Sequence, residues 1–434
     1  MDVEKSNFYL SNCADSGPLS VGGASAYGKE LASCLLQQQQ QSLELSSENF
    51  HSSSSSSSDI ISSNTRILAF KGKAPEKRRE DLRSLLAVKP RIRSATATAA
   101  KSARIISPNP EKILDAPEML DDYYLNLLDW SSQNVLAVAL NSSVYLWDAN
   151  SGTVDQLMEL SDSDYVCSVS WSQDGYYLSV GTSNAQVQLW DVETKSKVRT
   201  MSGQASRIGC TAWNQHLLSS GCRDGSIFHN DVRVANHHVA SLLNHTQEVC
   251  GLKWSPDGTQ LASGGNDNIL NIWDASSSQP RFSLTHHRAA VKALAWCPWQ
   301  PHLLASGGGS YDKCIKFWNT VSGNCTSSID TGSQVCSLLW SLDSKEIVSS
   351  HGYADNQLSV WRYPSMTKVV DLYGHSSRVL HMAMSPDGQT VVSGAADENL
   401  KFWRIFESAA ASKKASLNTT PTSKLESKLR KVIR

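Results

Sequence analysis

Tryptophan recurs along this chain at a nearly constant step, and that step constrains the fold more than any other feature of the sequence. Six tryptophans and one methionine follow one another at intervals of 41, 42, 41, 42, 44 and 44 residues, and each ends a short apolar run. The seven positions are Trp130, Trp171, Trp213, Trp254, Trp296, Trp340 and Met384. A repeat of about 40–45 residues is typical of a β-propeller blade built from four short strands. The spacing therefore predicts an all-β fold with seven blades.

A second aromatic series trails the first and indicates the type of propeller. In most repeats a tryptophan followed by aspartate or another polar residue ends the third strand, at Trp147, Trp190, Trp273, Trp318, Trp361 and Trp403. Turns such as Ser-Pro-Asp-Gly at 255–258 and 385–388, with a variant at 172–175, combine a preset negative φ with a tolerated positive one. These features predict a seven-bladed WD40 β-propeller. The third repeat reads Ile-Phe-His-Asn-Asp at 227–231, which we interpret as divergence of one blade.

Two histidines have the spacing of a hydrogen-bonded tetrad that is typical of WD repeats. The two predicted sets are His245, Ser263, Asp267 and Trp273, and His375, Ser393, Asp397 and Trp403. Histidines can also serve as metal or catalytic ligands. Because buried polar groups need hydrogen-bond partners, a structural network is the favoured interpretation.

Composition divides the chain into four regions. Residues 1–64 contain a glutamine run and a seven-serine run, which bury too little apolar surface to offset chain entropy, so we predict a disordered arm. Residues 65–113 form a basic arm, residues 114–406 hold the repeats, and residues 407–434 form a flexible polar tail.

Charge follows the same division and indicates the kind of partner. Residues 66–104 carry 12 Lys/Arg against 3 Asp/Glu, a balance of +9, whereas residues 115–406 carry 18 against 28, a balance of −10. An acidic propeller suits basic peptides. The basic arm lacks interleaved aromatic residues apart from Phe70, so nucleic acid is not an expected partner.

Other absences in the sequence exclude further classes of function. The ten cysteines include no Cys-x-x-Cys pair, so we expect no metal and no cofactor. No signal peptide and no run of 18 apolar residues occurs, so we expect a soluble protein of the nucleus and cytoplasm that does not enter membranes. There is no glycine-rich phosphate loop after a strand and no nucleophile–base motif, so we expect an adaptor and not an enzyme.

The seventh repeat supplies only three strands before the tail turns polar. Unpaired sheet edges are avoided in native proteins. We therefore expect the missing outer strand to come from before the first repeat, either from residues 103–106 or from residues 112–114.

Several stretches go beyond a generic WD repeat, namely residues 114–130, 247–254, 262–268, 290–299, 333–340 and 363–366. Through them, residues 65–406 resemble without a gap the Fizzy family, the WD-repeat co-activators that bring substrates to the anaphase-promoting complex, a ubiquitin ligase. The resemblance implies a co-activator that recruits degron-bearing substrates, such as cyclins and securin-like proteins, and so drives mitotic protein degradation.

The resemblance implies a first peptide site in a groove between the first and last blades of the propeller's top face. This groove accepts the destruction box, an Arg-x-x-Leu peptide, and its arginine should meet Asp115 and Glu398. Two carboxylates flanking a guanidinium make charge-assisted hydrogen bonds, which are stronger than neutral ones. The alternative is that Asp115 is a linker residue and Glu398 belongs to a solvated turn.

A second implied site, near the central channel, accepts the Lys-Glu-Asn box. The matching positions are Asp122, Asn266, Asn268, Ser310, Gln334 and Arg378. Asp122 suits the lysine of the peptide, Arg378 suits its glutamate, and the amide side chains suit its asparagine. Turn capping is the alternative for Asn266 and Asn268, and a solvated loop residue is the alternative for Arg378.

Two further segments resemble partner-binding motifs of the family. Residues 65–75 are similar to the segment by which Fizzy binds the spindle-checkpoint HORMA protein, with Arg66, Ile67, Leu68, Phe70 and Lys71 as the implied contacts. Fizzy-related lacks that form of the segment, so the resemblance favours the Fizzy branch and adds checkpoint kinase-like partners. Ile433 and Arg434 resemble the family's C-terminal tail, which docks on the ligase.

One departure from the family concerns activation of the ligase. Residues 1–65 contain no match to the C-box, Asp-Arg-(Tyr/Phe)-Ile-Pro-x-Arg, by which family members bind and activate the complex. This leaves open a divergent paralogue, a decoy that binds degrons or the checkpoint protein without activating the ligase, or a start of the protein elsewhere. A generic WD40 scaffold is the remaining alternative.

Overall fold

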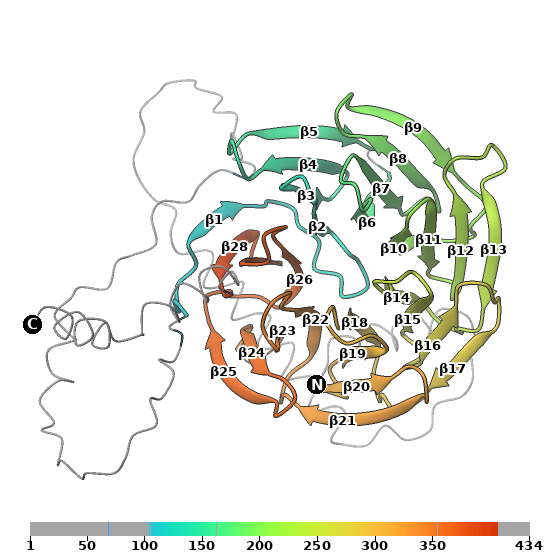
Figure 1. Ribbon diagram of the computed structural model, residues 1–434. Helices are drawn as coiled ribbons and strands as arrows, with labels where there is room; N and C mark the ends of the chain where they lie inside the picture. Colours follow the sequence, from blue (N-terminus) through green and yellow to red (C-terminus); the bar gives the residue numbers. More distant parts are fainter. Residues whose placement is uncertain (1–67, 69–103, 105, 162, 354, 407–434) are drawn as a thin grey trace, which may run out of the picture. The chain divides into compact units, whose positions relative to one another are not determined.

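The computed structural model describes residues 68, 104, 106–161, 163–353 and 355–406, and Figure 1 shows their arrangement. Seven four-stranded antiparallel sheets follow one another around a central channel. The prediction of a seven-bladed WD40 propeller is confirmed. The predicted disordered arm at 1–64, most of the basic arm and the tail at 407–434 lie outside the described residues.

Each of the first six blades consists of four strands that are consecutive in sequence. Blades 1 to 3 contain β2 (Leu128–Trp130), β3 (Val135–Leu140), β4 (Ser143–Asp148) and β5 (Val154–Glu159); β6 (Val166–Trp171), β7 (Tyr177–Thr182), β8 (Val187–Asp191) and β9 (Ser196–Met201); and β10 (Ile208–Asn214), β11 (Leu217–Cys222), β12 (Ser226–Asp231) and β13 (His238–Leu243). Blades 4 to 6 contain β14 (Val249–Trp254), β15 (Gln260–Gly265), β16 (Leu270–Asp274) and β17 (Pro280–Leu284); β18 (Val291–Trp296), β19 (Leu303–Gly308), β20 (Cys314–Asn319) and β21 (Asn324–Asp330); and β22 (Val335–Trp340), β23 (Glu346–His351), β24 (Leu358–Arg362) and β25 (Thr367–Leu372).

The seventh blade is closed by a strand from the other end of the repeat region. It contains β26 (Val379–Met384), β27 (Thr390–Ala395) and β28 (Asn399–Arg404), and its outer strand is β1 (Lys112–Asp115), which pairs antiparallel with β28. The prediction that residues 112–114 close the propeller is therefore confirmed. The candidate at 103–106 does not form this strand; Arg104 instead pairs with Glu346 in β23 at 2.6 Å.

Hydrogen-bonded tetrads lie within several of the blades, as the sequence predicts. In blade 4, His245 Nδ1 bonds Asp267, His245 Nε2 lies 2.8 Å from Ser263 Oγ, and the Trp273 indole donates to the same hydroxyl at 2.8 Å. The set built on His375 in blade 7 has the same contacts. Both ring nitrogens of each histidine thus form hydrogen bonds within the tetrad, which confirms the structural interpretation of both histidines.

The structure also contains two variations on the tetrad. In blade 5, His287, Ser306, Asp312 and Trp318 form a third complete tetrad. Its histidine and aspartate are 25 residues apart in place of 22, because the loop after β19 is two residues longer and the turn before β19 is one residue longer, so the fixed spacing missed it. In the divergent blade 3, Asn230 stands at the position of the tryptophan, and the preceding residue, His229, forms a hydrogen bond with Ser219 Oγ at 2.8 Å.

The predicted turns end at glycines that need a positive φ. Gly258 has a φ of 71°, and its N–H donates to Ser255 O at 2.8 Å. A Cβ added at Gly258 would lie 2.6 Å from Asn214 in the neighbouring blade, so this turn also fits closely against blade 3. Among the described residues, no helix is long and apolar enough to cross a membrane.

We expect the closing strand to control the stability of the propeller. Leu114, in the middle of β1, is fully buried, whereas its neighbour Ile113 is half-buried. Leu114→Ala should lower the free energy of unfolding by about 2–5 kcal/mol, because it leaves a cavity under the strand that closes the ring. Ile113→Ala is the matched control and should cost less. Equal losses for the two variants in urea unfolding would contradict a closing role for the buried face of β1.

Candidate functional site

The connection between β1 and β2 crosses the end of the central channel, and we call it the cap segment (residues 116–127). Figure 1 shows it turning inwards between the innermost strands of the blades. Tyr123 is buried at its centre, and its hydroxyl donates to Val335 O at 3.2 Å and Ala290 O at 3.4 Å, in blades 6 and 5. These carbonyls lie where the innermost strands begin, so the cap segment defines what we call the upper face.

Further polar contacts tie the cap segment to the middle blades. The Asn126 amide donates to Gly209 O at 2.8 Å and Cys250 O at 3.0 Å, in blades 3 and 4. The Tyr124 hydroxyl donates to Asn266 Oδ1 at 3.0 Å. A single short segment therefore contacts several blades around the channel, and its side chains are held in place by bonds to backbone carbonyls and to side chains of the blades.

One repeat position supplies a ring of side chains around the mouth of the channel. Each member lies six residues before a member of the aromatic series that defines the repeat: Tyr124, Tyr165, Arg207, Glu248, Ala290, Gln334 and Arg378. We call this set the channel-mouth ring. Two of the predicted Lys-Glu-Asn contacts, Gln334 and Arg378, belong to it. The others were missed, although counting back from the tryptophans would have found them.

Charged members of the ring bind the two aspartates of the cap segment. Arg207 donates to Asp122 Oδ2 at 2.9 Å and forms a bidentate pair with Glu248 at 2.7 and 2.8 Å. Burial alone would lower the pKa of Arg207, but Glu248 and Asp122 raise it above its usual range, so the guanidinium stays charged. Asp122, predicted to receive a peptide lysine, thus already has a cationic partner.

Arg378 makes the corresponding contact on the other side of the channel. Its Nε donates to Asp121 Oδ1 at 2.7 Å, and its Nη1 donates to the Tyr353 hydroxyl at 3.1 Å. Gln334 lies close by, because a Cβ added at Gly352 would come within 2.9 Å of Gln334 Oε1 and 2.8 Å of Arg378 Cβ. Gln334 is buried, and its Oε1 accepts no hydrogen bond in the described part of the chain.

The remaining predicted Lys-Glu-Asn contacts lie in two loops of the same face. The Asn266 side chain accepts a hydrogen bond from the Tyr124 hydroxyl and donates one to Gln247 Oε1 at 2.7 Å. Asn268 has a φ of 65° and its N–H donates to Gly265 O, so it has the conformation expected of a turn residue. Ser310 is half-buried in the loop after β19. Within the described ranges, no side-chain hydrogen bond joins two of the six predicted contacts directly; Asn266 and Arg378 each bond the cap segment, to which Asp122 belongs.

The two predicted destruction-box contacts are neighbours where blade 7 closes. Asp115 pairs with Asn399, the residue after Glu398, and the N–H of Ala116 donates to Glu398 O at 2.8 Å. Glu398 is exposed, and its carboxylate accepts the Glu118 N–H at 3.3 Å. Glu118, which sequence reasoning missed, is exposed as well. Three acidic residues therefore gather at one end of the closing strand.

Leu68 of the predicted checkpoint segment lies beside this acidic group. Its N–H donates to Asp115 O, and its side chain is 2% exposed, within the apolar cluster that contains Leu114. The other predicted contacts of the segment and the predicted ligase-docking residues lie outside the described residues: Arg66, Ile67, Phe70, Lys71, Ile433 and Arg434.

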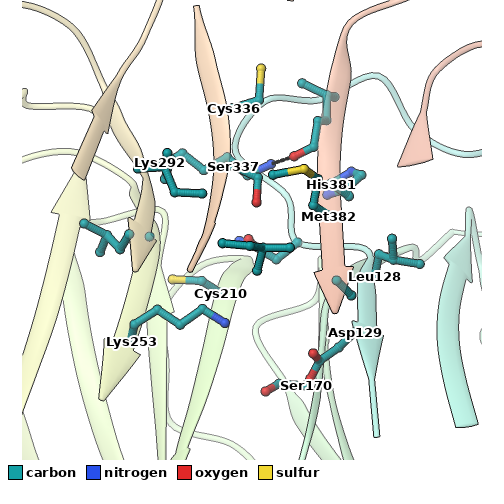
Figure 2. A pocket seen from close by; sticks show the side chains of 18 of the residues that line it. Leu128, Asp129, Ser170, Cys210, Lys253, Lys292, Cys336, Ser337, His381 and Met382 are labelled. Carbon is teal, nitrogen blue, oxygen red and sulfur yellow. Dashed lines mark hydrogen bonds between the residues drawn. The ribbon is translucent and has the colours of Figure 1, made fainter. Parts of the chain in front are cut away.

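Beneath the cap segment, the inner strands of all seven blades enclose a cavity of about 130 Å³ (Figure 2). Lys292 and His381 line its wall together with cysteine, serine and apolar side chains, and Asp129 and Lys253, which attract each other, line it as well. Nothing in the sequence reasoning pointed to this cavity. Among the described residues, no group of three or more His, Cys, Asp or Glu side chains could hold a metal ion.

The fold and the upper face together define a WD40 propeller with a capped channel and a charged rim suited to peptides. Residues 114–403 match the family model described as the CDC20/Fizzy WD40 domain. The chain belongs to the CDC20/Fizzy family, which confirms the resemblance found in the sequence.

Individual relatives agree with this assignment. The chain is 53% identical to the WD repeat-containing protein slp1 of Schizosaccharomyces pombe over 365 residues, 83% of this chain and 74% of slp1. It is 54% identical to the anaphase-promoting complex subunit cdc20 of Dictyostelium discoideum over 352 residues, 79% of this chain and 70% of that protein. A chain in the crystal structure of a mitotic checkpoint complex is 55% identical, with a TM-score of 0.68, and the match covers 74% of this chain and all of that one.

Proposed function

We propose that this protein is a substrate-recruiting co-activator of the anaphase-promoting complex and reads destruction-box and Lys-Glu-Asn degrons on the upper face of its propeller. It acts as an adaptor without catalysis of its own, in the nucleus and cytoplasm. The observation that carries the proposal is the clustering of charged side chains around the cap segment: acids at the closing strand, and an arginine beside an unpartnered amide oxygen at the channel mouth. These are the groups that bind a peptide arginine on one side and a peptide glutamate and asparagine on the other.

The destruction-box part of the proposal rests on the acidic group at the end of β1. Strand pairing holds the backbones of Asp115 and Glu398 close together, so the positions from which their carboxylates extend are set before any peptide binds. Binding of a guanidinium to both carboxylates therefore costs little side-chain entropy in the protein. Glu118 adds a third negative charge at the same place and strengthens attraction of a basic side chain.

Reversing both charges should abolish destruction-box binding. Asp115→Lys with Glu398→Lys is expected to weaken an Arg-x-x-Leu peptide by about 2–5 kcal/mol, because the peptide guanidinium then faces two ammonium groups. The control is Asp155→Lys with Glu193→Lys, an equal change of net charge at exposed positions of blades 1 and 2. Peptide affinity is measured by isothermal titration calorimetry, with circular dichroism to verify folding. If both double variants bind equally, the groove is wrongly assigned.

The Lys-Glu-Asn part rests on Arg378 and Gln334. Arg378 is only partly satisfied by Asp121 and Tyr353, since an arginine has five N–H donors and these contacts use three. The buried Gln334 Oε1 is an acceptor that an asparagine amide of a bound peptide would satisfy. Asp122 Oδ2 pairs with Arg207 and Asp122 Oδ1 accepts the N–H of Tyr124, so a peptide lysine would join an existing ion pair as a second cation.

Arg378→Glu should weaken a Lys-Glu-Asn peptide by about 2 kcal/mol or more and leave a destruction-box peptide nearly unaffected. This substitution also breaks the ion pair with Asp121 in the cap segment. Asp121→Asn is therefore the matched control, because it removes the same ion pair but keeps the arginine. Direct recognition by Arg378 predicts that Asp121→Asn binds the Lys-Glu-Asn peptide at least as well as wild type. An equal loss in both variants, by fluorescence anisotropy, would mean that Arg378 acts only by holding the cap segment.

The checkpoint part rests on Leu68. An apolar segment in a basic arm suits capture as an added strand, in which backbone hydrogen bonds give affinity and side chains give register. Leu68 uses its N–H and its side chain to contact the propeller beside Asp115. A HORMA protein that binds Leu68 in this way must first remove it from that position.

Ile67→Ala with Leu68→Ala should eliminate co-purification with the checkpoint HORMA protein, because the variant loses the apolar side chains that the partner would bury. Binding of both degron peptides should persist and serves as the control for folding. Wild-type recovery of the checkpoint protein by the variant would refute the segment and, with it, the Fizzy branch in preference to Fizzy-related.

Activation of the ligase is tested separately from degron binding. Purified full-length protein is added to the anaphase-promoting complex with a degron-bearing substrate, and ubiquitin transfer is measured. Stimulation supports the co-activator proposal. Degron binding without stimulation would instead identify a decoy, and failure to bind either degron would leave a generic WD40 scaffold.

A further inference from the structure

The channel beneath the cap segment contains a lysine that forms no ion pair with any of the described residues. Lys292 lies in β18 and is 5% exposed. Its Nζ donates to Leu380 O at 3.1 Å and lies 5.6 Å from the ring centroid of Tyr123. An ammonium has three N–H donors, and this is its one hydrogen bond among the described residues, none of whose ion pairs includes it.

The groups around Lys292 do not neutralise it. Burial raises the pKa of the Cys336 thiol to about 12 and raises that of Cys250 further, so both neighbouring thiols are uncharged near neutral pH. Burial also lowers the pKa of Lys292 to about 8, so the ammonium form still predominates at pH 7. Asp122 attracts Lys292 but forms its ion pair with Arg207. A buried charge without a partner is unfavourable.

A second donor lines the same cavity. His381 in β26 is 4% exposed, and its Nδ1 accepts the N–H of Leu127 at 3.4 Å. This contact assigns the ring proton to Nε2, which is buried and has no partner in the described part of the chain. Burial, and then the charge of Lys292, lower the pKa of His381 well below 6.5, so the ring is neutral. Figure 2 shows Lys292 and His381 on facing strands of the cavity wall.

We propose that the upper part of the channel binds one small monovalent inorganic anion of halide size between the ammonium of Lys292 and the Nε2–H of His381. The charge balance selects this class of ligand: Lys292 contributes one positive charge, His381 contributes none, and the opposite charges of Asp129 and Lys253 in the same lining offset each other. A dianion such as phosphate would leave an excess negative charge and would need more donors than these two groups provide. Water would satisfy the hydrogen bonds but not the charge.

The position of the site links the anion to the cap segment. Tyr123 stands over Lys292 and is fixed to blades 5 and 6 by its hydroxyl. An anion that neutralises Lys292 offsets the cost of burying its charge beneath the cap segment. The inference does not depend on degron binding, since it concerns the stability of the capped channel itself.

Thermal unfolding of the full-length protein tests the site. The midpoint Tm is measured in sodium chloride and in sodium gluconate at equal ionic strength, because gluconate is too large for the cavity. We expect a saturable, chloride-specific rise in Tm for wild type and loss of that rise in Lys292→Met. Lys316→Met is the matched control: this lysine is also buried, but it bonds Ser328 in blade 5, and its variant should keep the chloride effect.

A second measurement needs no variant. The NMR line of chloride should broaden in the presence of wild-type protein and narrow again when bromide displaces the bound ion, with no displacement by phosphate. A chloride effect on Tm that is equal in wild type and Lys292→Met, or chloride broadening that bromide does not reverse, would overturn the anion site and leave a water-filled channel. Stabilisation by phosphate alone would overturn the monovalent assignment.

Discussion

The pairing of β1 with β28 is the constraint on which the upper face depends. It joins the first strand of the propeller to the last and thereby closes the ring of blades. The same pairing places Asp115 beside Glu398 and fixes the point from which the cap segment leaves for the channel. A propeller without this strand would expose the edge of β28 and would also lose the origin of the segment that carries the charged site.

The repeat allowed much of the fold to be predicted, because blades are built from local hydrophobic patterns that recur at fixed intervals. Strand order, the closing strand and two tetrads followed from it. The third tetrad was missed because insertions before and after β19 lengthen the spacing between His287 and Asp312. The channel-mouth ring is also periodic, and Arg207 and Glu248 could have been found by counting six residues back from each tryptophan.

Other parts of the site have no periodic signal. The cap segment occurs once, so nothing in the repeat indicates that Tyr123 reaches carbonyls of blades 5 and 6. The position of Leu68 against Asp115 depends on a contact across the chain, which the charge and composition of the basic arm do not encode. The unpaired Lys292 looks in the sequence like one polar residue in an apolar strand, and only the fold shows that no carboxylate of the described residues forms an ion pair with it.

The cap segment makes the two proposed degron sites parts of one structure. Asp115 lies directly before it, and Asp121 and Asp122 lie within it, each held by an arginine of the channel-mouth ring. Those arginines keep the acids in fixed positions, but they also compete with any basic group of a ligand. The ion pairs therefore preorganise the upper face but leave fewer unpaired charges for a ligand. Only a peptide that binds both the acids and the arginines compensates for the contacts it displaces. This arrangement favours selectivity over high affinity.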